Sequence, residues 1–262
     1  MLILWIRDYR GKATPVQLKF PLGRVFLVQG HKNFCSLWKS SQASTATAVH
    51  NFYLKNIFGM PDKALELYTA DSSGCYDKPR SGSNVKQANR VDHITHKALS
   101  RFLSGPGLDP FFSRITENLI RNLQMLEIGD QWVEMDDLWG LFKSKITPAA
   151  IEAMCGSSIL ALTPKIADDL WAYDSAIPDL VKGLPRWWAP DAYAKRDDIL
   201  KSIKKWHASA REHFDGSQKG DDEDWDPQFG SEFIRSRQET FPRMDGMDDD
   251  AIAASDLGAI WA

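Results

Sequence analysis

Four basic side chains are spaced so that a single helix face would carry them all. Arg90, His93, Lys97 and Arg101 recur at intervals of three and four residues, which places side chains on one side of an α-helix. Apolar residues repeat beside them at positions 91, 94, 98 and 102. Such a helix is suited to holding the carboxylates of a large, mostly apolar ligand. An ordinary amphipathic helix with a solvated basic face has the same pattern, so both interpretations stay open.

A metal site is a second interpretation of the same segment. His93 and His96 stand three residues apart with Asp92 beside them, and two imidazoles at this spacing can bind one ion. No third ligand is marked elsewhere, and the chain has only 6 histidines. We therefore predict neither a metal site nor a catalytic residue here.

A group of aromatic residues lies between two expected helices, in the segment 177–190. It combines Trp187 and Trp188 with Arg186, prolines and a glycine. Aromatic and basic side chains in an exposed loop are typical of a membrane-interface contact or a ligand entrance. Two tryptophans that pack the loop onto the core would give the same composition, and the sequence leaves both explanations open.

Motifs that mark several common enzyme classes are missing from the sequence. It has no Gly-x-Ser-x-Gly segment, no phosphate-binding glycine loop, no dinucleotide fingerprint and no Cys-x-x-Cys pair. A dense basic patch with interleaved aromatic residues is also missing, so we predict no nucleic-acid partner. Cys35, Cys75 and Cys155 are odd in number and far apart. This spacing argues against a secreted disulfide scaffold and favours a reducing compartment inside the cell.

Composition indicates a globular protein. The 262 residues are 43% hydrophobic, which is enough for a packed core. The net charge of −3 conceals an acidic stretch, because residues 215–250 hold 12 acidic and 4 basic side chains. Its first part, 215–230, is expected to be an acidic surface link. The apolar run at 1–6 is too short for a membrane span and lacks a cleavage site, so we predict no anchor.

Periodicity predicts a mainly α protein with one domain, 1–262. Alternating residues from Pro15 to Phe20 and a β-rich run at 24–28 predict a β-hairpin region, 1–30. The remainder, 31–262, has a helical period. The expected helices cover residues 31–40, 46–58, 62–70, 89–104, 109–126, 136–155, 163–182, 191–214, 229–238 and 248–262. Residues 71–88 are rich in turn formers and are expected to be a long functional loop.

The last expected helix has a clear start and no clear end. It begins with Asp248, Asp249 and Asp250, acids that suit the positive end of a helix dipole. No Gly, Asn, Pro or basic turn ends it before Ala262. We therefore expect a longer protein that is cut within a long central helix. The apolar residues of this helix, 252, 257, 260 and 261, would then be bare, which predicts a marginally stable, aggregation-prone chain.

The order of these features resembles the front half of a cytochrome P450, a haem-thiolate monooxygenase. The matching features are the hairpin, the helix with His31–Trp38, the long polar loop, the basic helix and the following Phe102–Leu108. Gly129–Met135, with a helix that ends at Ala153–Gly156, is similar to the branch of prostacyclin synthase, sterol 7α-hydroxylase and many fungal members. The resemblance covers essentially the whole chain and depends on pattern and order.

This resemblance implies that the basic helix is the family's helix C, whose cations bind the haem propionates. His93, Lys97 and Arg101 are then the candidates for cofactor binding, although the family's common Trp-x-x-x-Arg is not present in that form.

The resemblance also implies a substrate channel. Trp187 and Trp188 would border it together with the 71–88 loop. The last helix would begin the long helix that crosses the haem face, and its residues Ala254, Leu257 and Gly258 would line the channel.

Several residues that carry out the chemistry of the family have no counterpart in this sequence. The oxygen-activating acid and threonine are expected just beyond Ala262, and the Glu-x-x-Arg motif and the cysteine ligand loop further on. Glu232–Arg235 matches Glu-x-x-Arg by letter but precedes the long helix. Cys155 lacks the upstream phenylalanine and glycine of the ligand loop. Because the axial thiolate sets the electronics of the iron, we expect this chain to be inactive alone, without a thiolate-bound haem.

The resemblance thus implies a truncated cytochrome P450-like protein, akin to enzymes that insert one oxygen atom from O₂ into an apolar substrate. A terpenoid, steroid-like molecule or secondary metabolite is the expected substrate, and a reductase the expected partner. Peripheral membrane contact through Trp187 and Trp188 is expected too. Family members are often bound to the endoplasmic reticulum, which implies an intracellular location. The alternatives are a non-catalytic helical ligand-binding or partner protein, and a gene fragment without a stable fold.

Overall fold

The computed structural model describes residues 14–20, 23–39, 47–104, 107–126, 129, 132–135, 137–214 and 225–261. The apolar run at 1–6, residues 215–224 of the predicted acidic link and Ala262 lie outside these ranges. Contacts divide the chain into two compact units, Met1–Ala48 and Val49–Ala262. The division groups the first helix with the hairpin, whereas the sequence prediction set the helical region apart from residue 31.

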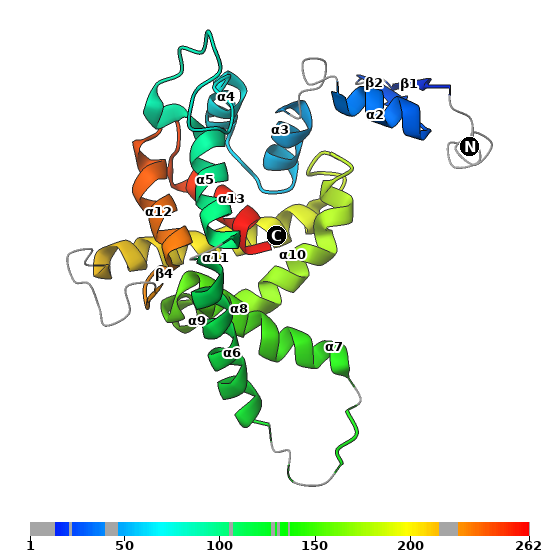
Figure 1. Ribbon diagram of the computed structural model, residues 1–262. Coiled ribbons are helices and arrows are strands. Elements are labelled where there is room, and N and C mark those ends of the chain that lie inside the picture. Colours follow the sequence, from blue (N-terminus) through cyan, green and yellow to red (C-terminus); the bar gives the residue numbers. More distant parts are fainter. Residues whose placement is uncertain are drawn as a thin grey trace. The chain divides into compact units, whose positions relative to one another are not determined.

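The first unit holds the predicted β-hairpin (Figure 1). Strand β1 (Val16–Phe20) pairs antiparallel with β2 (Gly23–Leu27), and Leu18 lies opposite Val25. Helix α2 (His31–Lys39) follows, and none of its residues is buried. The hairpin near the start of the chain is therefore confirmed.

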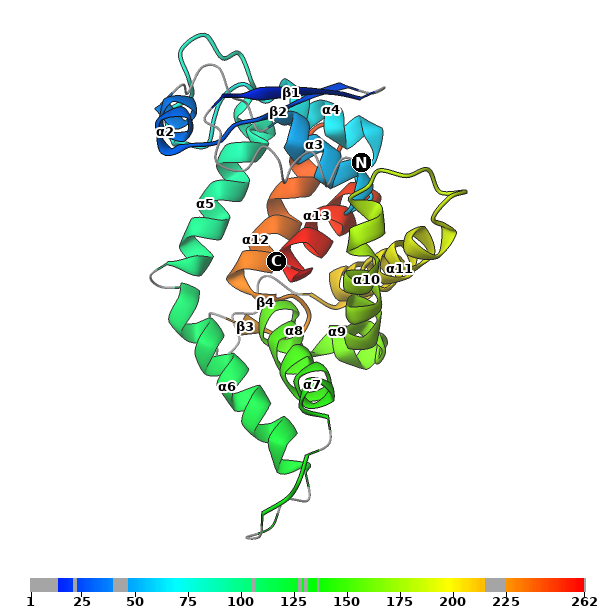
Figure 2. The same cartoon turned by 90° about the vertical axis from the view of Figure 1, so that its right-hand side faces the viewer.

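Helices make up most of the second unit (Figures 1 and 2). In chain order they are α3 (Thr47–Asn56), α4 (Asp62–Ala70), α5 (Val91–Leu103), α6 (Leu108–Gln124), α7 (Leu138–Leu141), α8 (Thr147–Cys155), α9 (Ser157–Leu162), α10 (Ile166–Leu180), α11 (Pro190–His213), α12 (Glu232–Thr240) and α13 (Asp249–Trp261). Short helical turns of other types are η1 (Gln87–Asn89), the π-helical η3 (Phe142–Ile146) and η4 (Phe241–Arg243). The predicted mainly α fold is confirmed.

The core of this unit forms around α10, α11 and α13. Ile199, Ile203 and Trp206 of α11 have no exposed surface, and α11 packs against both α10 and α13. Figure 2 shows α5 and α6 following one another along one side, with α12 next to α5 and α13 beyond α12. Among the described helices, none is both long and apolar enough to cross a membrane.

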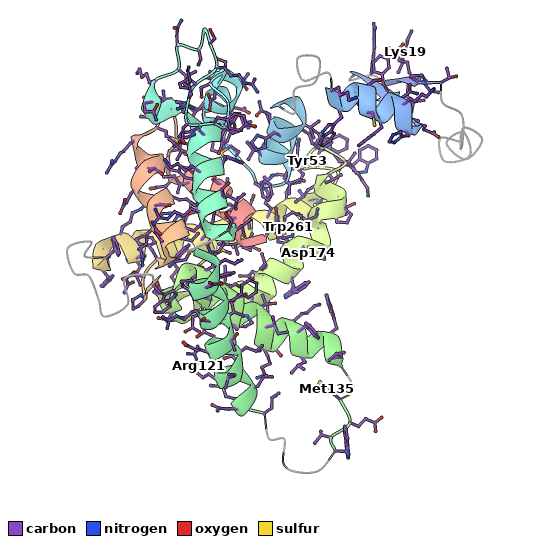
Figure 3. All side chains as sticks on the ribbon, in the orientation of Figure 1. Lys19, Tyr53, Arg121, Met135, Asp174 and Trp261 are labelled. Carbon is purple, nitrogen blue, oxygen red and sulfur yellow. The ribbon has the colours of Figure 1, made fainter. Side chains whose placement is uncertain are left out.

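The expectation that the last helix is bare is wrong for half of its apolar residues. Ile252 and Leu257 are 1% and 0% exposed, because α13 inserts among the other helices. Ile260 is partly buried. Trp261, 36% exposed, donates its Nε1–H to Oδ1 of Asp174 at 2.9 Å, and Figure 3 shows the two side chains near one another.

Residues 225–231 form a small hairpin that the sequence did not predict. β3 (Trp225–Asp226) pairs antiparallel with β4 (Gly230–Ser231), and Phe229 between them is 2% exposed. Phe229 and Gly230 are buried, and Trp225, Asp226 and Gln228 are partly buried, so the prediction of a solvated link at 215–230 needs correction at these residues. Packing against α8 holds the hairpin in place: Ser231 Oγ donates to the Met154 carbonyl at 2.9 Å, and Trp225 Nε1 donates to the Ala153 carbonyl at 3.1 Å.

Candidate anion-binding pocket

The polar loop before α5 positions the start of this helix. Asp71 caps it, because its Oδ2 accepts the backbone N–H of Asp92 at 3.0 Å. Ser73 Oγ donates to Asp71 Oδ1 at 2.6 Å and accepts Nε of Arg90 at 3.1 Å. Arg90 also donates to the backbone carbonyls of Tyr76 and Asp77. The loop and the helix start therefore form one hydrogen-bonded structure.

Arg90 does not share the exposed basic face that its spacing predicted. The residue is 1% exposed, and backbone and hydroxyl oxygens, rather than solvent, surround its guanidinium. Its role is to hold the loop. The other three basic residues of α5 lie on the predicted common face.

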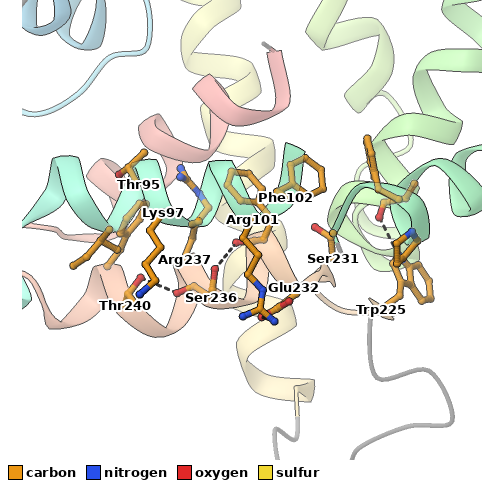
Figure 4. A pocket seen from close by; sticks show the side chains of 18 of the residues that line it. Thr95, Lys97, Arg101, Phe102, Trp225, Ser231, Glu232, Ser236, Arg237 and Thr240 are labelled. Carbon is orange, nitrogen blue, oxygen red and sulfur yellow. Dashed lines mark hydrogen bonds and ion pairs between the residues drawn. The ribbon is translucent and has the colours of Figure 1, made fainter. Parts of the chain in front are cut away.

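A cavity of about 590 Å³ lies between α5, α6 and α12. His93, Lys97 and Arg101 all line it, so the structure brings together the three residues that the sequence predicted for cofactor binding. Figure 4 shows Lys97 and Arg101 reaching toward α12, where Arg101 lies beside Glu232. Cavities of this size accommodate small-molecule ligands and cofactors.

Each of these three residues meets a carboxylate. His93 Nε2 and Lys97 Nζ both lie 3.6 Å from Oδ1 of Asp77, and Arg101 lies 3.0 Å from Oε1 of Glu232. The His93 side chain is 8% exposed, whereas those of Lys97 and Arg101 are 71% and 63% exposed. His93 is charged only when it is protonated. The pocket therefore has a polar rim with one buried imidazole.

Aromatic rings form the apolar wall of the cavity. Phe102 and Phe233 stack with their centroids 4.7 Å apart, and Phe111 lies 4.8 Å from Phe102. Arg114, a lining residue that sequence reasoning missed, lies 4.6 Å above the ring of Trp225 and 3.6 Å from Glu117. Its place on the wall depends on how α6 packs, which spacing within α6 does not reveal. A flat apolar ligand with carboxylates would match this combination.

A buried ion pair supports the far wall. Arg237 of α12 lines the cavity and donates Nε to Oδ1 of Asp256, on α13, at 2.7 Å. Oδ2 of Asp256 accepts a hydrogen bond from Gln238 at 2.7 Å and lies 3.1 Å from Nε2 of His207. Burial opposes ionisation of Asp256, but the Arg237 charge and the contact with His207 outweigh burial and hold the pKa of this carboxyl below its usual value. In the sequence, this ion pair was indicated only by Asp256, an acid within the apolar part of the last helix.

The predicted channel residues do not join this cavity. Trp187 and Trp188 lie between α10 and α11 and are 75% and 64% exposed. Ala254 and Leu257 have no exposed surface and belong to the core, while Gly258 packs near the ring of Phe58. Their assignment to a substrate channel stays a prediction.

The pocket offers cations for the carboxylates of a haem, but its lining offers no thiolate for the iron. Five basic residues line the cavity, His93, Lys97 and Arg101 from α5 with Arg114 and Arg237, but none of the lining residues is a cysteine. Cys155 is completely buried, and burial raises the pKa of its thiol. Within the part of the chain that the structure describes, no three His, Cys, Asp or Glu side chains are placed to hold a metal ion.

Comparison with known proteins finds relatives among fungal enzymes. The chain is 26% identical over 256 residues to the cytochrome P450 monooxygenase fsoE of Humicola fuscoatra and 25% identical over 257 residues to the cytochrome P450 monooxygenase efuG of Hormonema carpetanum. It is 26% identical over 226 residues to the cytochrome P450 monooxygenase calL of Penicillium decumbens. These matches cover 96%, 97% and 83% of the chain but 42%, 43% and 41% of the relatives. No protein-family model and no solved structure matches.

Proposed function

Because the chain is related to fungal cytochrome P450 monooxygenases over nearly its whole length, we propose that it supplies part of the cofactor and substrate environment of a haem-dependent monooxygenase. It spans about two fifths of the length of these relatives, 42% for the first. The activity of the whole enzyme, oxygen insertion into an apolar terpenoid, steroid-like or secondary-metabolite substrate, belongs to this proposal.

The placement of His93, Lys97 and Arg101 around an aromatic cavity carries the proposal. A haem has an apolar macrocycle and two propionates, so it needs an apolar wall and cations at one rim. Phe102 and Phe233 provide the wall. Lys97 and Arg101 supply an ammonium and a guanidinium as hydrogen-bond donors, and His93 Nε2 can donate to a carboxylate when it carries a proton.

A bound haem would supply the oxygen-activating chemistry, for which the enzyme family needs a cysteine thiolate. The lining residues include no cysteine. We therefore propose that this chain alone binds the carboxylates of the cofactor without activating oxygen. Catalysis would then also require an axial thiolate, a reductase and an apolar substrate.

Haem titration of the purified chain tests the proposal. We expect saturable binding, and no thiolate-type band after reduction under CO. Replacement of both Lys97 and Arg101 by Met should weaken binding about tenfold, because each exposed cation contributes up to about 1 kcal/mol. Lys182→Met is the matched control, since its exposed ion pair with Asp179 lies outside the lining of the cavity. Equal affinity of all three proteins would contradict the assignment of the site, and a stoichiometric thiolate-type spectrum would contradict the proposed inactivity.

A second function, binding of an apolar carboxylate without catalysis, is favoured by the cation rim itself. A long-chain fatty acid, which has a carboxylate but no porphyrin ring, separates the two proposals. Binding of the fatty acid at least as tightly as haem would support a general ligand-binding protein, whereas a clear preference for haem would support the cofactor site.

A further inference from the structure

Asp77 places a carboxylate against two of the three basic residues that α5 contributes to the pocket. Its Oδ1 lies 3.6 Å from both His93 Nε2 and Lys97 Nζ. The Asp77 side chain is 85% exposed, and Lys97 is 71% exposed. The chain therefore already supplies an anionic partner where a ligand carboxylate would bind.

Hydrogen bonds from α5 hold the backbone around Asp77. Arg90 donates NH1 to the Asp77 carbonyl at 2.9 Å and NH2 to the Tyr76 carbonyl. His93 Nδ1 lies 3.1 Å from the Cys75 carbonyl and donates to it. Three consecutive loop residues are thus bonded to the start of α5. This anchoring reduces the ordering cost that makes most exposed ion pairs weak.

We propose that Asp77 is an internal counter-ion that competes with the carboxylate of an incoming ligand for His93 and Lys97. The identity of that ligand, a porphyrin dicarboxylate, rests on the proposed function. Because the Asp77 carboxylate offsets part of the positive charge of Lys97, a ligand anion gains less from Lys97 Nζ than it would if Asp77 were neutral. A neutral ligand does not compete for these cations, so Asp77 should weaken the binding of anionic ligands only.

Removing the charge of Asp77 should therefore strengthen the binding of anions. Asp77→Asn keeps the size of the side chain and the backbone carbonyl that Arg90 contacts. An exposed pair of this kind is worth up to about a fivefold change in affinity, so we expect iron-free protoporphyrin to bind about two- to fivefold more tightly. The dimethyl ester of the same porphyrin has no charge and should bind both proteins equally.

Two further variants test whether the effect depends on the pair. Asp179→Asn removes an exposed acid whose partner, Lys182, does not line the cavity, and it should leave porphyrin affinity unchanged. In a Lys97→Met background, the gain from Asp77→Asn should shrink, because the main competing cation is gone. Fluorescence titrations at fixed salt measure all five proteins, which are the wild type, Asp77→Asn, Asp179→Asn, Lys97→Met and the double variant, and circular dichroism checks their helix content.

Inorganic pyrophosphate, titrated by calorimetry, separates this inference from the proposed function. Tighter pyrophosphate binding by Asp77→Asn, with no porphyrin binding by any variant, would refute the proposed function and support the counter-ion. Unchanged affinity for both anions would overturn the counter-ion. An equal gain for the porphyrin and its dimethyl ester would also overturn it, because the substitution would then act by loosening the loop.

Discussion

Asp256 and Arg237 form a buried ion pair between α13 and α12, and they are 0% and 3% exposed. The guanidinium also lies 4.6 Å from the centroid of the Phe241 ring and 5.1 Å from that of Phe233. A charge in such a place costs free energy unless it is paired. Removing one partner of the pair should therefore affect stability far more than removing an exposed acid.

We predict that Asp256→Asn lowers the free energy of unfolding by about 3 to 5 kcal/mol, because it leaves Arg237 buried without its counter-ion. The control Asp179→Asn, in an exposed pair with Lys182, should cost less than about 1 kcal/mol. Urea denaturation with far-ultraviolet circular dichroism measures both. Equal losses in the two variants would contradict a special role for the buried pair.

The same pair predicts a pH dependence. The folded-state pKa of Asp256 is lowered, so the stability it contributes is fully present above the unfolded value of about 3.9. That contribution is lost as the pH falls through the lower folded value. The stability difference between the wild type and Asp256→Asn should shrink below about pH 4. A difference that grows with acidification would contradict this sign.

Periodicity within one helix could predict which side chains share a face, and three of the four residues that it grouped, His93, Lys97 and Arg101, line one cavity. It could not predict that Arg90 is buried, because that outcome depends on the loop carbonyls at Tyr76 and Asp77. The pairing of Arg237 with Asp256 joins two helices, and no spacing along the chain reveals it.

At the scale of elements, the contact between the β3–β4 hairpin and the end of α8 depends on two glycines. Gly156 and Gly230 have φ values of +89° and +65°. A Cβ atom at Gly230 would overlap the amide nitrogen of Gly156 and the Met154 carbonyl. The two segments can approach this closely only because neither glycine has a side chain.

We predict that Gly230→Ala destabilises the protein by at least about 2 kcal/mol, because steric overlap adds to the cost of a positive φ. Gly82→Ala is the matched control: its φ is +85°, but no atom lies within 4 Å of the added Cβ. The control should therefore show only the backbone cost, about 1 to 2 kcal/mol. Chemical denaturation of both variants measures the difference, and a larger loss for Gly82→Ala would refute the overlap.

Most helix boundaries could be predicted because long periodic segments such as α10 and α11 bury one face. The missed elements are short. α9 has 6 residues and follows Gly156 directly, so its pattern is too brief to separate from that of α8. The β3–β4 hairpin has 2 residues in each strand, and only its packing against α8 defines it.

At the scale of the whole molecule, Trp187 and Trp188 form an exposed aromatic pair in the loop between α10 and α11. Their ring centroids lie 5.4 Å apart, and exposed tryptophans beside a basic residue are typical of membrane-interface contacts. Double replacement by Ser should reduce co-sedimentation with anionic liposomes several-fold without changing helix content. Replacement of Trp132, which is fully exposed in another loop, controls for nonspecific adsorption of aromatic residues. Unchanged sedimentation of the double variant would contradict membrane contact through this loop.

The burial of α13 has a consequence for how this sequence can diverge. Ala251, Ala253 and Ala254 have no exposed surface and, with Ile252, lie on more than one side of the helix. Neighbours therefore surround the helix, and each added methylene must displace a packed atom, at a typical cost of 1 to 3 kcal/mol. Substitutions at these positions should persist only when a neighbour becomes smaller at the same time. The helix is thus expected to evolve by paired changes, whereas exposed helices such as α2 can change one residue at a time.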